Sequence, residues 1–142
     1  MAALSSYRDT KAMQNGYGYP EIYSFPVKDT VKIYKGALVV LDAGYLKPAV
    51  AESGKVPVGI ALDDADNSTT VTGHADGFVS CRVRRGTFKF DNKSNDQVVA
   101  ADVGASCYIG DDHTVCHTST TNTAVGKVVQ IDSDGVWVQV GL

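Results

Sequence analysis

The chain has 142 residues, a formal net charge of −3, 44% hydrophobic and 20% charged residues, which is the composition of one soluble globular domain. The acidic balance argues against a nucleic-acid-binding protein, which presents a basic face. No run approaches the ~20 apolar residues of a membrane span, and the first ten residues lack the pattern of a secretory signal. Three cysteines, an odd number, argue against a secreted disulfide framework and favour a reducing cytoplasm.

Residues 1–30 differ from the rest of the chain. They hold four of the seven tyrosines, and their charges cancel. We find neither helical nor strand periodicity in them and interpret them as an extended N-terminal arm, since such a segment cannot bury its aromatic side chains alone. A disordered leader is the alternative. The arm is predicted to order against a neighbouring subunit or another partner through Tyr17, Tyr19, Tyr23 and Phe25.

From residue 31 to residue 142 the chain is predicted to form short strands separated by Gly, Pro and Asp clusters. The expected strands cover residues 31–35, 37–41, 45–50, 56–62, 70–77, 78–86, 87–90, 97–102, 105–109, 113–118, 124–131 and 136–142. In the strand 78–86, Val79, Cys81 and Val83 are expected on one face, and Ser80, Arg82 and Arg84 on the other. No helical period appears, so the fold class is all-β, a small barrel or sandwich.

Part of the chain occurs twice. The stretch GALVVLDAGYLKPAV, residues 36–50, matches GASCYIGDDHTVCHT, residues 104–118. Further along, Val58-Gly59-Ile60 matches Val125-Gly126-Lys127, and Asp76-Gly77 matches Asp134-Gly135. Two copies are too few for a solenoid and predict one closed barrel or sandwich with two similar halves.

The strand 37–41 has apolar residues on both faces. Such a strand must be covered on both sides, by the core on one and often by a neighbour on the other. We therefore predict a homo-oligomer.

Cys107, His113, Cys116 and His117 carry zinc-binding side chains, but their spacing is not that of a zinc site, and Cys116 and His117 should point to opposite faces of a strand. We expect structural cysteines and no metal or cofactor. A Cys107–Cys116 disulfide stays open, because a two-residue turn at Asp111-Asp112 would place them opposite each other.

The histidines support no enzymatic site, because His74, His113 and His117 lie in polar surroundings without a nucleophile motif. The acidic residues 63–68 lack the Gly and Glu of a calcium loop and predict a hairpin loop. Arg82, Arg84, Arg85 and Lys89 form the one local excess of positive charge. They are either a solvated strand face or a docking surface for an acidic partner.

The order of these elements resembles the phage capsid cement (head decoration) proteins. The resemblance rests on residues 36–40, 58–61, 83–90, 104–108, 118–123, 125–126 and 138–142. It implies a non-enzymatic virion protein that is assembled in the host cytoplasm, binds the major capsid protein on the outside of the assembled head and stabilises it, usually as a trimer. A tail or baseplate component and a carbohydrate-binding β-module are the alternatives.

Overall fold

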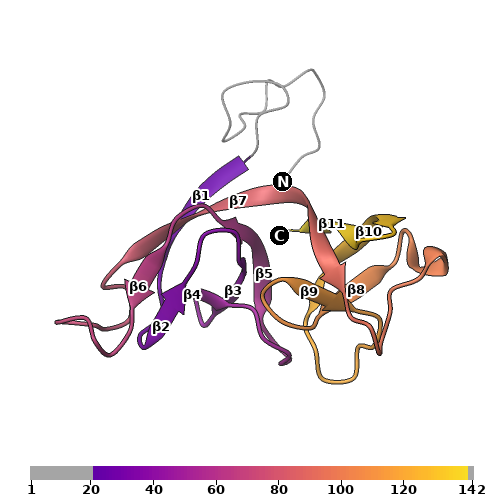
Figure 1. Cartoon of the computed structure of the whole chain (residues 1–142). Helices are drawn as coiled ribbons and strands as arrows, with labels where there is room; N and C mark the ends of the chain where they lie inside the picture. The colour runs from indigo at the N-terminus through magenta and orange to yellow at the C-terminus, as the bar shows by residue number, and fades with distance from the viewer. Residues whose placement is uncertain (1–20, 141–142) are drawn as a thin grey trace, which may run out of the picture.

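A computed structural model describes residues 21–140 of the chain, and these residues confirm the all-β fold class (Figure 1). No α-helix occurs among them; a single 3-10 turn, η1, spans Ala100–Asp102, where a strand was expected. The strands are β1 (Glu21–Pro26), β2 (Val31–Ile33), β3 (Leu38–Asp42), β4 (Tyr45–Pro48), β5 (Val56–Ala61), β6 (Ala65–Asn67), β7 (Ser80–Asn92), β8 (Ser106–Ile109), β9 (Thr114–Cys116), β10 (Ala124–Asp132) and β11 (Gly135–Val140).

Nine of these strands form two small barrels that share β7, which runs across both lobes in Figure 1, and β2 pairs with β6 in a separate two-stranded sheet. In the first barrel the order is β1, the first half of β7, β5, β3 and β4, and a parallel bridge between Val27 and Leu46 closes the ring. In the second barrel the order is the second half of β7, β11, β10, β8 and β9, and the parallel pair of β9 with β7 closes it. The strand order of the second barrel therefore repeats that of the first.

Matching hydrogen bonds confirm the predicted duplication. The Gly36 N–H donates to the carbonyl of Ala61 at 2.8 Å, and the Gly104 N–H donates to that of Val128 at 2.8 Å. A return bond accompanies each of these: the Ala61 N–H donates to the Ala37 carbonyl at 2.9 Å, and the Val128 N–H donates to the Ala105 carbonyl at 2.9 Å. The two glycines also share a left-handed backbone, with φ of 92° and 89°, a conformation that favours glycine.

The duplication also extends upstream of the sequence repeat. The Lys28 N–H donates to the carbonyl of Leu46 at 2.9 Å, and the Lys93 N–H donates to that of Val115 at 3.0 Å. These two bonds follow equivalent parallel pairings at the closure of each barrel. β1 is therefore the counterpart of the second half of β7, and the repeating units are residues 21–85 and 86–140.

Part of the predicted N-terminal arm belongs to the folded domain. Residues 21–26 pair along their whole length with β7, and Val27 is completely buried. The boundary predicted at residue 30 is wrong for this reason, and the folded domain includes Glu21. The residues before Glu21, including Tyr17 and Tyr19, lie outside the described part of the chain.

β7 is one strand of 13 residues, where two strands separated at Gly86 were expected. Gly86 continues the ladder because it pairs with Val140 of β11. The predicted alternation is correct in its first half, where Cys81 and Val83 are buried. The same zigzag then carries Phe90 into the interior of the second barrel.

Each barrel encloses its own apolar core. The first core contains Val27, Ile33, Val39, Leu46, Val58, Ala61, Ala65, Cys81 and Val83. The second core contains Leu38, Val40, Ala49, Phe90, Val98, Cys107, Ile109, Val115, Val125, Val128, Val136, Val138 and Val140.

β3 separates the two cores. Val39 points into the first core, whereas Leu38 and Val40, although they belong to the first unit, point into the second. Both faces of this apolar strand are consequently buried within one chain. The reason given for a homo-oligomer, an uncovered face of residues 37–41, is therefore incorrect.

Candidate functional site

Of the four aromatic residues expected to bind a neighbour, Tyr23 and Phe25 contribute to the fold itself. Both lie on the face of β1 that is turned towards the first barrel, opposite Val83 and Cys81. Their ring centroids are 6.2 Å apart, Phe25 packs against the first core, and the Tyr23 hydroxyl donates to Glu21 at 2.6 Å. Both side chains are half-buried, so little of their surface is left for a partner.

The three arginines of β7 do not form one patch. Arg82 and Arg84 are exposed on the outer face of the first barrel, whereas Arg85 points to the other side of β7, where its Nη1 lies 3.4 Å from Glu21 Oε2. Arg82 holds Asp63 with two bonds, at 3.0 and 2.8 Å. The hydrogen bond from Arg82 is also the main reason why the pKa of Asp63 is lowered. Part of the local positive charge is thereby neutralised within the chain.

Arg84 is in a different position, because no described carboxylate pairs with it. Its guanidinium lies 5.7 Å from the centre of the Phe88 ring, a cation–π contact. Opposite Arg84 on β1 lies Ile22, whose side chain is 44% exposed. Together with Ser24 and Arg82, these residues form what we call the β1–β7 face.

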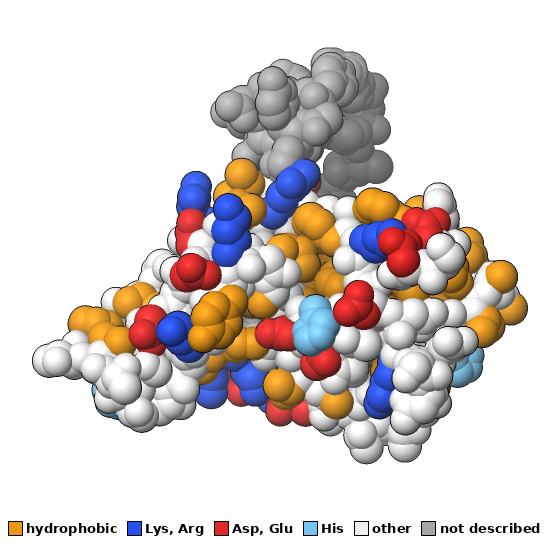
Figure 2. Space-filling model, viewed as in Figure 1, with side chains coloured by type: hydrophobic (Ala, Val, Ile, Leu, Met, Phe, Trp, Pro, Cys, Tyr) orange, Lys and Arg blue, Asp and Glu red, His pale blue; other side chains and the backbone are white. Residues whose placement is uncertain are grey.

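Figure 2 shows Lys and Arg side chains gathered over β1 and the first half of β7, around an exposed hydrophobic group. The β1–β7 face combines exposed aliphatic surface with a guanidinium that pairs with no carboxylate of residues 21–140. Such a surface can bind an acidic or mixed protein surface. Sequence reasoning missed Ile22, and its cross-strand position beside Arg84 could only have been inferred by recognising β1 as a strand.

The cysteines are free thiols, all buried. Burial is the main cause that raises the pKa of each of them, to about 12 for Cys107. The sequence left a Cys107–Cys116 disulfide open, which needs the two residues opposite each other on β8 and β9. In the structure Cys116 instead lies opposite Tyr108. The turn between β8 and β9 is longer than two residues, which shifts the register by one.

The predicted His and Cys residues do not converge. The Nδ1 atom of His117, which follows β9, lies 3.0 Å from Asp102. That of His74, in the loop between β6 and β7, lies 2.6 Å from Asp29. Within residues 21–140, the one group whose ligand atoms lie close enough for a metal ion is Asp111, Asp112 and His113.

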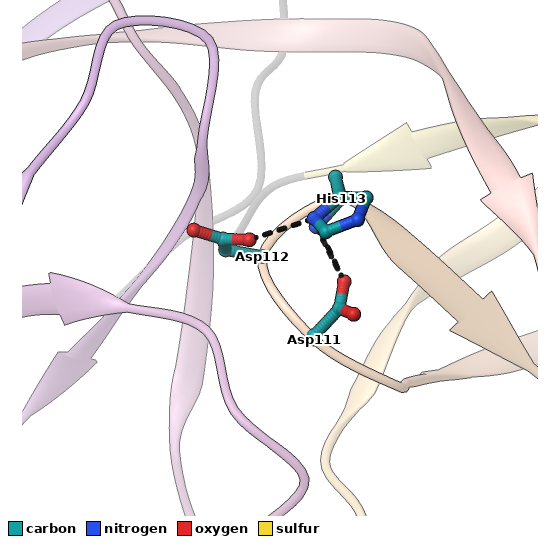
Figure 3. A group of neighbouring side chains, drawn as sticks. All are labelled: Asp111, Asp112 and His113. Atoms are coloured by element: carbon teal, nitrogen blue, oxygen red, sulfur yellow. Dashed lines mark hydrogen bonds and ion pairs between the residues drawn. The ribbon is translucent and has the colours of Figure 1, made fainter.

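This group lies in the β8–β9 turn (Figure 3). The imidazole Nδ1 of His113 is 2.9 Å from Asp112 and 3.1 Å from Asp111. The hydrogen bond to Asp112 is the main cause that raises the pKa of His113. The imidazole therefore contacts both carboxylates of the group. The turn also has a structural contact, since the Asp112 carbonyl accepts the N–H of Leu38 at 2.8 Å.

The acidic stretch 63–68 contains a short strand, β6, rather than a simple hairpin loop. Its carboxylates have separate partners in the chain: Asp63 binds Arg82, Asp64 accepts the Lys35 N–H at 2.8 Å, and Asp66 accepts the Ser68 N–H at 3.0 Å. These carboxylates therefore position loops.

A cleft of about 560 Å³ lies at one end of the second barrel and is lined by Asp91, Asn92, Gln97, Val98, Ile131, Asp132, Ser133, Asp134 and Gly135. Lys89 bridges two of its carboxylates, those of Asp132 and Asp134. The indole of Trp137 donates to Asp132 at 2.7 Å. Two of the three carboxylates in the lining, those of Asp132 and Asp134, are thus held by Lys89.

Within residues 21–140, no helix has the length and apolar character needed to cross a bilayer. Comparisons with models of protein families, with curated proteins and with solved structures found no match.

Proposed function

We propose that this protein is a structural head decoration (cement) protein of a phage, which binds the major capsid protein on the outer surface of the assembled head and stabilises it. The observation that carries the proposal is the β1–β7 face, in which Arg84, which no described carboxylate pairs with, lies beside the exposed Ile22. The order of sequence elements described above points to the same family.

The scaffold suits this role. Two barrels that share a strand and bury cores on both sides of β3 give a rigid body without a catalytic constellation among the described residues. A protein that binds only the assembled state stabilises that state by mass action. Repetition over many lattice sites multiplies modest contacts. One guanidinium and one aliphatic side chain per copy are contacts of this modest kind.

The protein is proposed to act in the virion as a homotrimer, without enzymatic activity. Since the described strands bury both faces of β3 within one chain, trimer contacts must come from other surfaces. The mass of the free protein, measured by light scattering at micromolar concentration, tests this part separately.

The decisive experiment mixes purified protein with undecorated heads of the phage that encodes it and measures co-sedimentation. We expect Arg84→Glu to weaken binding at least about tenfold, which is about 1.4 kcal/mol, because it reverses charge against an acidic surface. Lys127→Glu is the matched control, since Lys127 is exposed on β10 of the other barrel. Failure of the unchanged protein to co-sediment refutes the function, and equal effects of both variants refute the β1–β7 face as the site.

A further inference from the structure

A pocket of about 260 Å³ lies where the two units meet. Ile60 of β5 lines it from the first unit, and Phe88 and Phe90 of β7 line it from the second. All three side chains pack with the second core, Phe90 from within it and the other two from partly buried positions. The pocket, which we call the Ile60 pocket, therefore has an apolar wall that the core holds in place.

Arg84 lies at the rim of the Ile60 pocket. It is directly opposite Ile60 in the ladder between β5 and β7, and cross-strand neighbours have their Cβ atoms about 4.5–5.5 Å apart. Its guanidinium also lies 5.7 Å from the centre of the Phe88 ring. On the other side, Arg84 is opposite the exposed Ile22 of β1. The β1–β7 face thus continues through Arg84 into the pocket.

The two ends of the pocket carry opposite charges. β7 runs from Arg84 to Asp91, and Asp91 lines the pocket at the end away from Arg84. Lys89 and His113 also line it. The ammonium of Lys89 is held by two carboxylates of the cleft described above, and the imidazole of His113 lies against the carboxylates of its own turn (Figure 3). Arg84 and Asp91 therefore give the pocket a positive and a negative end.

The size of the pocket limits what enters it. Sites for drug-sized molecules have volumes of about 300–1,000 Å³, so a pocket of about 260 Å³ is on the scale of one large side chain. At protein interfaces, side chains that fill such pockets contribute a large share of the binding energy. The Ile60 pocket is therefore of the size that an anchoring side chain of a partner protein needs.

We propose that the Ile60 pocket receives an apolar side chain of the capsid protein, and that Arg84 binds a carboxylate next to that side chain. This inference rests on the proposed function and names the element that the β1–β7 face recognises. Charge complementarity selects the carboxylate, because no carboxylate of residues 21–140 pairs with Arg84 and a guanidinium binds a carboxylate with two parallel hydrogen bonds.

The remaining features of the pocket select the rest of the element. The apolar wall of Ile60, Phe88 and Phe90 favours an aliphatic or aromatic side chain, whose burial removes apolar surface from water. Asp91 at the far end disfavours a second acidic group there. The recognised element thus has its acid on one side only, the side of Arg84.

The test uses three small probes and the full-length protein, observed residue by residue by NMR. The probes are 3-phenylpropionate, 3-phenylpropanol and 3-phenylpropylamine, which share a ring and a chain and differ in the charge of the end group at pH 7. We expect all three to shift the amide signals of Ile60, Phe88 and Phe90. The carboxylate should bind about fivefold more tightly than the amine, because one is attracted to Arg84 and the other repelled.

Two variants separate the charge from the apolar wall. Arg84→Gln should abolish the preference for the carboxylate and leave the affinity for the alcohol unchanged, since the wall remains. Lys127→Gln, on the exposed side of β10, is the matched control and should keep the preference. Ile60→Thr keeps a β-branched residue in the strand and should weaken the binding of all three probes.

Several results overturn the inference. The absence of shifts at the pocket amides in the unchanged protein does so, as does equal affinity for the carboxylate and the amine. Shifts of the same amides that depend on protein concentration without any probe assign the pocket to a second copy, and so overturn the capsid protein as its occupant.

Co-sedimentation with undecorated heads separates this inference from the proposed function. We expect Arg84→Gln and Ile60→Thr each to weaken co-sedimentation, and Lys127→Gln to leave it unchanged. If the unchanged protein does not co-sediment, the proposed function fails, and the capsid protein is overturned as the source of the acidic and apolar element. If it co-sediments equally well after Ile60→Thr, the function stands and the inference about the pocket is overturned.

Discussion

Gly126 lies against the main-chain carbonyl of Gln139 so closely that a Cβ atom has no room between them. Gly59, its counterpart in the first unit, lies in the same way against the carbonyl of Arg84. Each glycine thus permits the close approach of two neighbouring strands at the same place in its barrel.

We expect Gly126→Ala to destabilise the protein by about 1–3 kcal/mol, the usual cost of overpacking, because a main-chain carbonyl in a ladder cannot move aside cheaply. The midpoint of urea unfolding measures the change. Lys127→Ala, one residue on and exposed, should change stability by no more than about 0.5 kcal/mol. Equal midpoints for the two variants would contradict the close approach.

The two barrels should unfold together. Leu38→Ala removes a side chain of the first unit from the second core, and such a truncation costs about 2–5 kcal/mol. We expect one cooperative transition that shifts as a whole, because β3 belongs to both cores. Tyr fluorescence and far-ultraviolet circular dichroism should report coincident curves, and two separate transitions would show that the barrels are independent.

The buried thiols predict a loss of stability at alkaline pH. In the folded protein the pKa of Cys107 is raised from 9.0 to about 12, and those of Cys81 and Cys116 are raised as well. Above the unfolded pKa the unfolded state releases these protons while the folded state retains them. The stabilisation present below pH ~8.5 is therefore lost as pH rises towards 12.

Urea unfolding at pH 7.5 and pH 10 measures this loss of stability. Cys107→Val should fold normally and reduce the alkaline loss, because valine is close in size and does not ionise. A pH dependence that is unchanged in this variant would contradict the assignment to Cys107.

The β8–β9 turn predicts a histidine titration above the ordinary range. The hydrogen bond to Asp112 raises the pKa of His113, so Asp112→Asn should lower it towards ~6.5. NMR titration of the His113 imidazole protons in the unchanged protein and in the variant measures both pKa values. Because the folded pKa is raised, any contribution to stability is present below the unfolded pKa and is lost as pH rises through the folded one.

Metal analysis of the purified protein should find no stoichiometric zinc, and one bound ion per chain would overturn this interpretation of the turn.

The duplication could be predicted because its glycines are few and have fixed roles. Gly36 and Gly104 share a left-handed backbone, and Gly59 and Gly126 share a close contact, so another residue at these positions is costly. The alternation of the buried Cys81 and Val83 with exposed residues could also be predicted from the sequence.

β1 was missed because its signal is mixed. Its odd positions hold Glu21, Tyr23 and Phe25, and a carboxylate at the start of the series disguises the period. β1 and the second half of β7 have equivalent positions but different residues: Tyr23 corresponds to Phe88, and Phe25 corresponds to Phe90. Only the hydrogen-bonded register reveals it.

The covering of β3 could not be predicted from local pattern at all. The apolar run Leu38, Val39 and Val40 indicates that both faces of the strand are buried. It does not indicate which part of the chain, or which partner, covers each face. The contacts of Leu38 with the second unit, which begins at residue 86, depend on how the two barrels pack. A short stretch of sequence around Leu38 carries no information about that packing.

The covering of β3 has a consequence for ancestry. A chain with only the first unit would leave Leu38 and Val40, now completely buried, facing water. An ancestral single-unit protein would have had to bury that surface against another molecule, and a second copy of the same protein was always available as a partner. Duplication within one gene, with the last strand of one unit running on into the first strand of the next, would have turned such a pair into a single polypeptide. In this view β7 marks the point where the two copies of the ancestral unit were joined.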